Sequence, residues 1–413
     1  MRIMGFRLAG RRCKLTELLC RLTLVGAVML MLPAAASAEI RLIAKTIIPG
    51  NATDLSRLDD GLGSDCNLFG GISGIAYTGK DNLYILLPDR GPNDGKTNYL
   101  CRFHTMKITV AGGTLMTSLQ ATTLLRDEMG RPLVGSLAAL APTAKLGARL
   151  DPEGVRVTSR GTICISDEYG PYVDEFDQQG KRLKRFPVPA RYQVQHPDAD
   201  PELERKRNTV GREPNRGMEG LALTPDGRKL VGIMQSPLLQ EGGRKGTNVR
   251  ILEIDVANHR TREFLYTLRD ASTCVSEILA VNEHEFLVLE RDGQKSKGPP
   301  FCKIFKIDLA RATDIQQLAQ LPVTGVPEGV AAVTKELFLD LHDARFGFKA
   351  GEMPVKVEGL AFGPDLPDGS RLLLVTTDND FVVDQPTRLF AFAIDRADLP
   401  GWQGRATTQN VPR

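Results

Sequence analysis

The fold is decided by residues 216–236, RGMEGLALTPDGRKLVGIMQS. A Glu-Gly pair opens this stretch, and two short apolar runs lie on either side of Pro225-Asp226-Gly227. Proline fixes its own φ angle and glycine accepts a left-handed conformation, so Pro-Asp-Gly favours a tight turn. The apolar runs have the composition of strands. The stretch therefore predicts a β-hairpin.

The same plan recurs four more times along the chain. The recurrences are SGIAYTGKDNLYILLPDRG (73–91), EGVRVTSRGTICISDEYG (153–170), EILAVNEHEFLVLERD (277–292) and EGLAFGPDLPDGSRLLLVTTDND (358–380). Each begins with a carboxylate, or with Ser73 in the first case, and closes its second apolar run on polar residues. The repeats are roughly sixty to eighty residues apart, longer than the about 40–50 residues of common propeller blades. Repeated hairpins at such spacing indicate a β-propeller with long loops.

The number of blades follows less directly from the repeats. Further strand-like runs, NVRILEIDV, KIFKIDL and RLFAFAID, follow the last three hairpins, so each repeat predicts a four-stranded blade. We expect an all-β chain that forms a single propeller. Five hairpins are visible, and the early run RLIAKTII (41–48) supplies material for another blade. Six blades are therefore predicted, with five and seven as alternatives.

Two segments depart from the strand pattern. Residues 190–216 are polar and charged without periodicity, which predicts a long surface insertion at a blade boundary. Residues 331–348, with KELFLDL, fit either a short helix or a weak pair of strands.

Residues 1–38 have the features of a signal peptide. Basic residues precede the apolar run LTLVGAVMLML (22–32), and Ala36-Ser37-Ala38 is a small-residue cleavage site. An uncleaved membrane anchor is the alternative, and the small-residue ending argues against it. We expect cleavage near Ala38, a periplasmic or secreted protein with no membrane span, and a propeller domain over residues 39–413.

Charge and composition narrow the range of partners. The chain carries 53 Lys and Arg against 50 Asp and Glu, and residues 1–38 contribute six of the former and one of the latter. The exported protein is thus close to neutral, without a basic stripe, and nucleic acid is not an expected partner. We expect a monomer that acts on a small-molecule ester or phosphoester.

Five cysteines follow the leader. They are Cys66, Cys101, Cys164, Cys274 and Cys302. In an oxidising compartment an odd count suggests two disulfides and one free thiol. Cys66 and Cys101 flank the first hairpin and Cys274 and Cys302 flank the fourth, so these two local pairings are predicted, although the connectivity stays open. Cys164 lies inside the run TICIS and is expected to be buried and free.

The repeated carboxylates are the candidate site. In a propeller the innermost strands line a central channel, so residues at the same place in each repeat form a ring. The predicted ring consists of Glu153, Glu219, Glu277 and Glu358, and a second ring at the ends of the second strands includes Asp89 and Asp378. Carboxylates that converge in one cavity repel one another, and a hard cation with oxygen ligands, Ca²⁺, relieves that repulsion. We therefore predict these six residues as metal ligands.

Both the carboxylates and their basic neighbours also have a structural interpretation. A recurrent Glu can accept backbone N–H bonds from the neighbouring blade without any ligand. Arg90, Arg216 and Arg291 lie beside the carboxylates in sequence. They either neutralise the ring or bind a phosphate or carboxylate of a substrate. The second role makes them the predicted substrate-binding residues.

Other catalytic schemes lack their motifs. The chain has no G-x-S-x-G, H-E-x-x-H or C-x-x-C sequence, and none of its five histidines occupies the repeated Glu position. A Ser-His-Asp enzyme is therefore not expected, and no catalytic residue is assigned from sequence.

Five motifs in order resemble a family. They are DRGPN (89–93), DEYGPY (167–172), RGMEGL (216–221) with QSPL (235–238), LERD (289–292), and VEGL (357–360) with DNDF (378–381). Together they are similar to the phytase-like ("esterase-like activity of phytase") exported proteins of bacteria, over nearly all of the chain after the leader. The resemblance implies a β-propeller and hydrolysis of phosphoesters or other esters, with Ca²⁺. The Asp-rich motif near the N-terminus of calcium-dependent propeller phytases is not evident, so the resemblance does not extend to inositol phosphates.

Two functions thus remain in view. One is an exported, calcium-dependent hydrolase of phosphomonoesters or other esters that works at the carboxylate-lined mouth of the channel. The other is a non-catalytic propeller that binds a ligand or protein partner on its channel face.

Overall fold

The protein was analysed as a computed structural model, which describes residues 40–58, 67–292, 300–349 and 351–404. Within these ranges the strands form five antiparallel four-stranded sheets. The predicted signal peptide, residues 1–38, lies outside the described residues and stays a prediction. Among the described residues, no helix is both long enough and apolar enough to cross a bilayer.

Four sheets are formed by consecutive strands. The first contains β2 (Ile72–Tyr77), β3 (Leu83–Pro88), β4 (Arg102–Ala111) and β5 (Thr114–Leu124). The second contains β6 (Pro152–Val157), β7 (Ile163–Asp167), β8 (Tyr172–Phe176) and β9 (Arg182–Phe186). The third contains β10 (Met218–Leu223), β11 (Lys229–Met234), β12 (Asn248–Asp255) and β13 (Thr261–Thr267). The fourth contains β14 (Thr273–Ala280), β15 (Glu285–Asp292), β16 (Cys302–Asp308) and β17 (Thr334–Asp340).

The fifth sheet joins the two ends of the domain. It contains β18 (Val357–Phe362), β19 (Arg371–Thr377), β20 (Thr387–Ile394) and, as its outer strand, β1 (Arg41–Ile48). The prediction of a single all-β propeller is confirmed, but six blades is wrong, because the described strands form five. The run RLIAKTII does not start another blade: it pairs along its whole length with β20.

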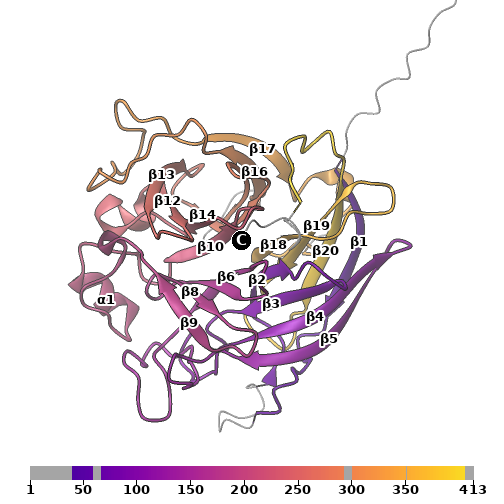
Figure 1. Cartoon of the computed structure of the whole chain (residues 1–413), viewed down its shortest axis with the longest axis horizontal. Coiled ribbons are helices and arrows are strands. Elements are labelled where there is room, and N and C mark those ends of the chain that lie inside the picture. Colours follow the sequence, from indigo (N-terminus) through magenta and orange to yellow (C-terminus); the bar gives the residue numbers. More distant parts are fainter. Residues whose placement is uncertain (1–39, 59–66, 293–299, 350, 405–413) are drawn as a thin grey trace, which may run out of the picture. The chain divides into compact units, whose positions relative to one another are not determined.

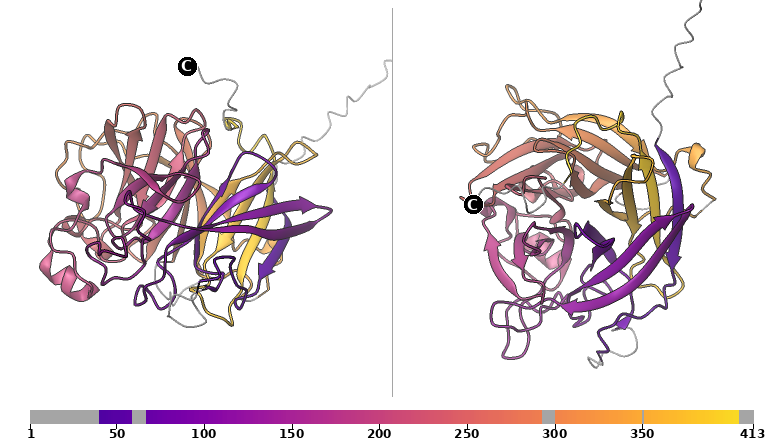
Figure 2. Two further views of the ribbon diagram at one scale, coloured as in Figure 1. Left: turned by 60° about the horizontal axis from the view of Figure 1, so that its bottom comes forward. Right: turned by 45° about the vertical axis from the view of Figure 1, so that its right-hand side comes forward.

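The first strand of each sheet lies innermost. The inner strands contact one another in the order β2, β6, β10, β14 and β18, and β18 contacts β2, so they close a ring about the axis of the propeller (Figure 1). Figure 2 shows the sheets of the domain from two other directions. Apolar side chains of successive blades pack against each other, for example Leu221 and Ile278 between the third and fourth blades. The core is therefore divided among the gaps between blades.

The glycine of the Glu-Gly pair has a packing role. A Cβ on Gly154 would lie 2.5 Å from the backbone nitrogen of Leu221, and one on Gly220 would lie 2.6 Å from that of Ile278. Each partner belongs to the inner strand of the next blade. Glycine at this position thus lets neighbouring inner strands approach closely enough to close a narrow ring.

The two irregular segments are settled by the structure. The insertion at 190–216 carries the short helix α1 (Pro201–Arg207), whose first turn is capped by the side chain of Asp200. Residues 331–348 contain the single strand β17 and the helical turn Ala344–Phe346, so the segment is neither a helix alone nor a pair of strands.

The predicted disulfide Cys274–Cys302 is wrong. Both cysteines are buried free thiols, and Arg291 of β15 lies directly opposite each of them in the sheet. Two strand spacings separate them by about 9.5 Å. A disulfide needs Cα atoms within about 7 Å.

The other predicted disulfide, Cys66–Cys101, is not formed by Cys101 in this structure. Cys101 is a buried free thiol that donates to the carbonyl of Leu150 at 3.3 Å, and Cys66 lies outside the described residues. Cys164 is buried and free in β7, as predicted.

Candidate functional site at the acidic mouth of the channel

Every inner hairpin has a register shift near the start of its first strand. The shifts fall between Ile72 and Gly74, Pro152 and Val155, Met218 and Gly220, Val275 and Glu277, and Val357 and Gly359. A β-bulge of this kind redirects a side chain out of the regular alternation. The residues so displaced are Ser73, Glu153, Glu219, Ser276 and Glu358. They lie where the inner strands begin, at one end of the channel, which we call the acidic mouth.

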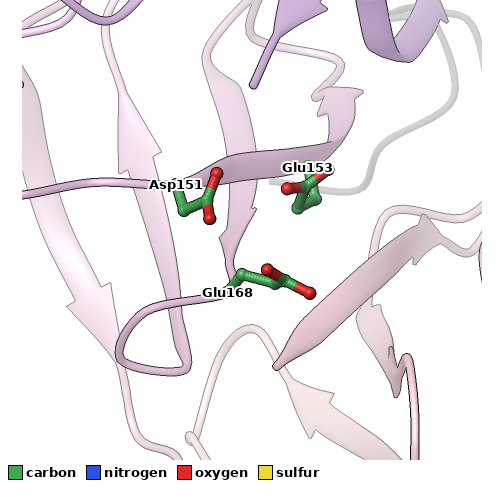
Figure 3. Close-up of side chains that lie close together, drawn as sticks. All are labelled: Asp151, Glu153 and Glu168. Atoms are coloured by element: carbon green, nitrogen blue, oxygen red, sulfur yellow. The ribbon is translucent and has the colours of Figure 1, made fainter. Parts of the chain in front are cut away.

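A compact carboxylate cluster lies at this mouth (Figure 3). Carboxylate oxygens of Asp151, Glu153 and Glu168 all lie within 4.8 Å of one another. Asp151 directly precedes β6, Glu153 is the second residue of β6, and Glu168 directly follows β7 in the same blade. The side chain of Glu219 on β10 lies near enough to Glu168 for each to shift the pKa of the other. Four carboxylates from two neighbouring blades thus converge.

Burial makes the charged forms of this cluster costly. The pKa of Glu168 is raised to about 7 by burial and by Asp151, against the lowering effect of Arg90 and Glu219. The pKa of Glu153 is raised well above its ordinary value by burial and by Glu219. That of Glu219 is raised well above its ordinary value by burial and by Glu168. Near neutral pH the cluster therefore retains protons unless a positive charge replaces them.

Two oxygen atoms of the cluster have no protein donor. Glu168 is 2% exposed and Glu219 is 3% exposed. Among the described residues, nothing hydrogen-bonds to Glu168 Oε1 or Glu219 Oε2. Buried carboxylate oxygens are normally satisfied, so an unsatisfied pair beside a carboxylate cluster is what an oxygen-coordinated cation site requires.

Cations border the cluster. Arg90 donates from Nη1 to Oδ2 of Asp151 at 2.8 Å, and the same nitrogen lies 3.9 Å from Oε2 of Glu168. Arg216 donates to Oγ of Ser236 at 2.9 Å. Both arginines are buried. The mouth thus combines carboxylates with guanidinium groups, and Arg90 is the predicted substrate-binding residue that lies nearest the cluster.

Arg291 links the fourth blade to the fifth. It donates from Nε to Oγ of Ser276 at 2.7 Å and from Nη2 to Oε1 of Glu358 at 2.5 Å. Glu358, a predicted metal ligand, therefore has a guanidinium as its partner in this structure.

Asp378 and Asp380 share a lysine that sequence analysis missed. Lys356 donates to Oδ2 of Asp378 at 2.8 Å and also contacts Asp380. Burial by itself would raise the pKa of Asp378, but Lys356 lowers it below its ordinary value. Burial and Asp378 raise the pKa of Asp89 well above its ordinary value.

Glu277 does not occupy the ring position, because Ser276 does. Its Oε1 accepts backbone N–H bonds from Leu221 of the preceding blade at 3.2 Å and from Ile278 at 2.9 Å. Its Oε2 lies 3.0 Å from Nη2 of Arg156. Arg156 also donates to the carbonyls of Ile75 and Ile278, at 3.1 and 2.7 Å. Glu277 thus makes the contacts that the structural interpretation of the repeat predicts.

Two site residues had a signal that could have revealed them. Asp151 and Lys356 each stand two positions before a repeated Glu, in DPEG and KVEG. The residue two positions ahead of the bulge therefore also reaches the mouth. Glu168 belongs to the polar residues that follow the second apolar run of its repeat, and the sequence pattern assigns it no separate role.

A pocket of about 170 Å³ lies beside Arg90. The insertion at 190–216 supplies much of its wall, including Glu204, Arg205 and Arg212. Arg212 donates to Oε1 of Glu204 at 2.5 Å and to the carbonyl of Tyr169 at 2.9 Å. The predicted surface insertion therefore covers the outer side of the acidic mouth.

A known protein family matches most of the chain. The family model "Phytase-like: Esterase-like activity of phytase" matches residues 67–381. An "Uncharacterized secreted protein" of Arthroderma benhamiae is 29% identical over 285 residues, which cover 52% of this chain and 56% of that protein. The chain thus spans about half the length of this curated relative.

Solved structures are more distant. Virginiamycin B lyase from Staphylococcus aureus is 12% identical with a TM-score of 0.36, over 86% of this chain and 100% of that one. A luciferin-regenerating enzyme is also 12% identical, with a TM-score of 0.34, over 82% of this chain and 96% of that one. Neither likeness carries an argument about activity.

Proposed function

Because the chain belongs to the phytase-like family, described by esterase-like activity of phytase, we propose that it is an exported hydrolase of phosphomonoesters or related esters. The reaction takes place at the acidic mouth. Export is supported by the secreted relative and by the signal-peptide features of residues 1–38.

One observation supports this site above all others. Asp151, Glu153 and Glu168 bring carboxylate oxygens within 4.8 Å of one another, and buried oxygens of Glu168 and Glu219 have no donor among the described residues. Perturbed titratable groups that converge at a channel mouth are typical of functional sites.

The donor set fits Ca²⁺. All candidate ligands are carboxylate oxygens, which calcium prefers, and Glu153 is only half-buried, so the cluster has access to solvent. We propose Asp151, Glu153, Glu168 and Glu219 as the residues that hold it. A divalent cation in this position supplies a Lewis acid that polarises a phosphoryl or carbonyl oxygen.

The protein's own residues provide the remaining chemistry. Arg90 is placed to bind the anionic oxygens of an ester, because its guanidinium lies between the cluster and the adjacent pocket. Without the cation, burial and Asp151 raise the pKa of Glu168 to about 7, and burial and Glu168 raise the pKa of Glu219 well above its ordinary value. Binding of a cation would therefore displace protons from these two carboxylates.

The test measures hydrolysis of 4-nitrophenyl phosphate and 4-nitrophenyl acetate, each with calcium and with EDTA. We expect turnover in calcium, loss on chelation, and loss of most of the turnover in Glu168→Gln, because this substitution removes a charged ligand of the cation. Glu175→Gln is the matched control, since Glu175 is equally buried in the same blade but pairs with Lys184 at 3.3 Å. Failure to hydrolyse either ester in calcium would replace this proposal with the non-catalytic propeller.

A further inference from the structure

The helix of the insertion at 190–216 is attached to the propeller through a buried carboxylate. Of the seven residues of α1, only Glu204 is buried. Leu203, the apolar side chain next to it, is 40% exposed, so α1 has no apolar face that packs on the core. Burying a carboxylate is costly unless charged or polar partners compensate it. The position of Glu204 therefore depends on its partners.

Both oxygens of Glu204 contact arginines. Oε1 accepts from Nη1 of Arg212 at 2.5 Å, and Oε2 accepts from Nη2 of Arg149 at 3.3 Å. Oε2 also accepts from the backbone nitrogen of Asp198 at 3.0 Å. Arg149 is 9% exposed and Arg212 is 1% exposed. Within the described residues no other carboxylate pairs with either guanidinium, so Glu204 compensates the charge of both.

The same two arginines meet at Tyr169, the residue that directly follows Glu168. Nε of Arg212 donates to the carbonyl of Tyr169 at 2.9 Å. The guanidinium of Arg149 lies over the ring of Tyr169, 4.7 Å from its centroid. The phenol donates to the carbonyl of Gly135 at 2.7 Å. The chain next to Glu168 is thus held by contacts to a carbonyl, a ring and a hydroxyl, two of which come from partners of Glu204.

Charge gives this network a second effect on the carboxylate cluster. Arg149 stands two positions before Asp151 in the chain. Arg212 lies near enough to Glu168 to act on its charge. Two uncompensated guanidinium groups at these places would repel a bound cation. Glu204 places one negative charge between them and so reduces that repulsion.

We propose that Glu204 is a positioning residue of the cation site at the acidic mouth. It acts through Arg149 and Arg212 rather than by direct contact with the cation. It holds the two arginines against the chain beside the proposed ligands and compensates their charge. The inference rests on the proposed function, because it assumes that the carboxylate cluster binds calcium. Helix α1 then contributes to the metal site although it supplies no ligand.

The experiment measures calcium binding to the EDTA-treated full chain by isothermal titration calorimetry. Glu204→Gln removes the charge and keeps the shape of the side chain. We expect the Kd for calcium to rise about tenfold, the lower end of the effect that partners of metal ligands have. Luminescence of bound Tb³⁺, a calcium surrogate, decays at different rates in H₂O and D₂O, and the difference counts coordinated water. We expect more coordinated water in Glu204→Gln, because water replaces a ligand that is no longer held in place.

Asp174→Asn is the matched control. Asp174 is buried in the same blade and, like Glu204, accepts from two arginines, Arg182 at 3.0 Å and Arg185 at 2.7 Å. It lies on β8 and takes no part in the network of α1. This substitution should lower the melting temperature, as Glu204→Gln does, but leave the Kd for calcium and the hydration of Tb³⁺ unchanged. The control therefore separates the loss of a buried ion pair from an effect on the cation site.

Glu204→Asp decides the matter if Glu204→Gln does not fold. It keeps the charge but is one methylene too short to contact both arginines, so calcium binding should weaken in the same direction. An unchanged Kd and unchanged Tb³⁺ hydration in the variant that folds would overturn this inference alone. An equal loss of calcium binding in Asp174→Asn would also overturn it. A wild type that binds neither ion would overturn the cation site itself, and this inference with it.

Discussion

Arg291 of the fourth blade donates to Glu358 of the fifth at 2.5 Å, and both side chains are more than nine-tenths buried. The contact joins two blades whose apolar faces also pack against each other. A buried ion pair of this kind tolerates the loss of one partner poorly, because the other charge is left without compensation.

Glu358→Gln should therefore destabilise the domain by about 3–5 kcal/mol in denaturant unfolding. The matched control is Asp368→Asn, since the Arg41–Asp368 pair is about half exposed on both sides. That substitution should cost less than about 1 kcal/mol. Equal effects of the two changes would mean that the Arg291–Glu358 contact does not hold the blades together.

The stability of the metal-free protein should fall as pH rises from about 4.5 to 7. Glu168 has a pKa raised to about 7 in the folded state, from an ordinary value of 4.5, so the folded protein holds its proton more tightly than the unfolded chain does. This contribution is complete below pH 4.5 and is lost as pH passes 7, and it amounts to about 3 kcal/mol.

Urea unfolding in EDTA at pH 5 and at pH 7.5 measures this loss. Glu168→Gln should reduce the difference between the two pH values. Glu277→Gln serves as comparison, because burial also raises the pKa of Glu277 to about 7. This substitution should remove a second, independent part of the difference in unfolding free energy between the two pH values. A wild-type protein that is more stable at pH 7.5 in EDTA would contradict the raised pKa of Glu168.

Calcium should raise the melting temperature, and chelation should lower it. A ligand that binds only the folded state stabilises it by about 2.7 kcal/mol at one hundred times its Kd. Glu153→Gln should weaken this response, whereas Glu175→Gln should leave it intact. A wild-type melting curve that ignores added calcium would remove the metal from the proposed mechanism.

Cys164, Cys274 and Cys302 should all react with iodoacetamide in the denatured, unreduced protein. Each is a buried free thiol, and two strand spacings separate Cys274 from Cys302. Peptide mapping after alkylation identifies the modified residues. A peptide cross-linked between Cys274 and Cys302 would mean that β14, β15 and β16 pair in another register.

The sequence predicts the hairpins well because their signals are local. Pro225-Asp226-Gly227 and the apolar runs beside it determine a turn and two strands without help from the rest of the chain. The number of blades has no local sequence signal, because it depends on which distant strand pairs with β1. Its apolar pattern suits an outer strand of the fifth blade as well as the start of another blade, and only the closed ring distinguishes them.

The candidate site, like the fold, was predictable from sequence only in its repeated parts. The repeat identifies Glu153, Glu219 and Glu358. In the fourth blade it points to Glu277, whereas the bulge places the neighbouring Ser276 in the ring, because the bulge cannot be located from sequence. The partners of the ring, such as Lys356, depend on contacts between segments distant in sequence. The disulfide prediction failed for the same reason: closeness along the chain says little about which strands are neighbours.

The pairing of β1 with β20 has a consequence for the order in which the protein folds. β1 is the first strand of the domain to be synthesised and β20 is the last, so the ring cannot close until the chain is complete. Contacts between such distant segments form slowly, because a long loop must be closed first. Until β20 is available, β1 has no partner strand and the ring of blades stays open. The final blade closes the ring only after the last strand has been delivered.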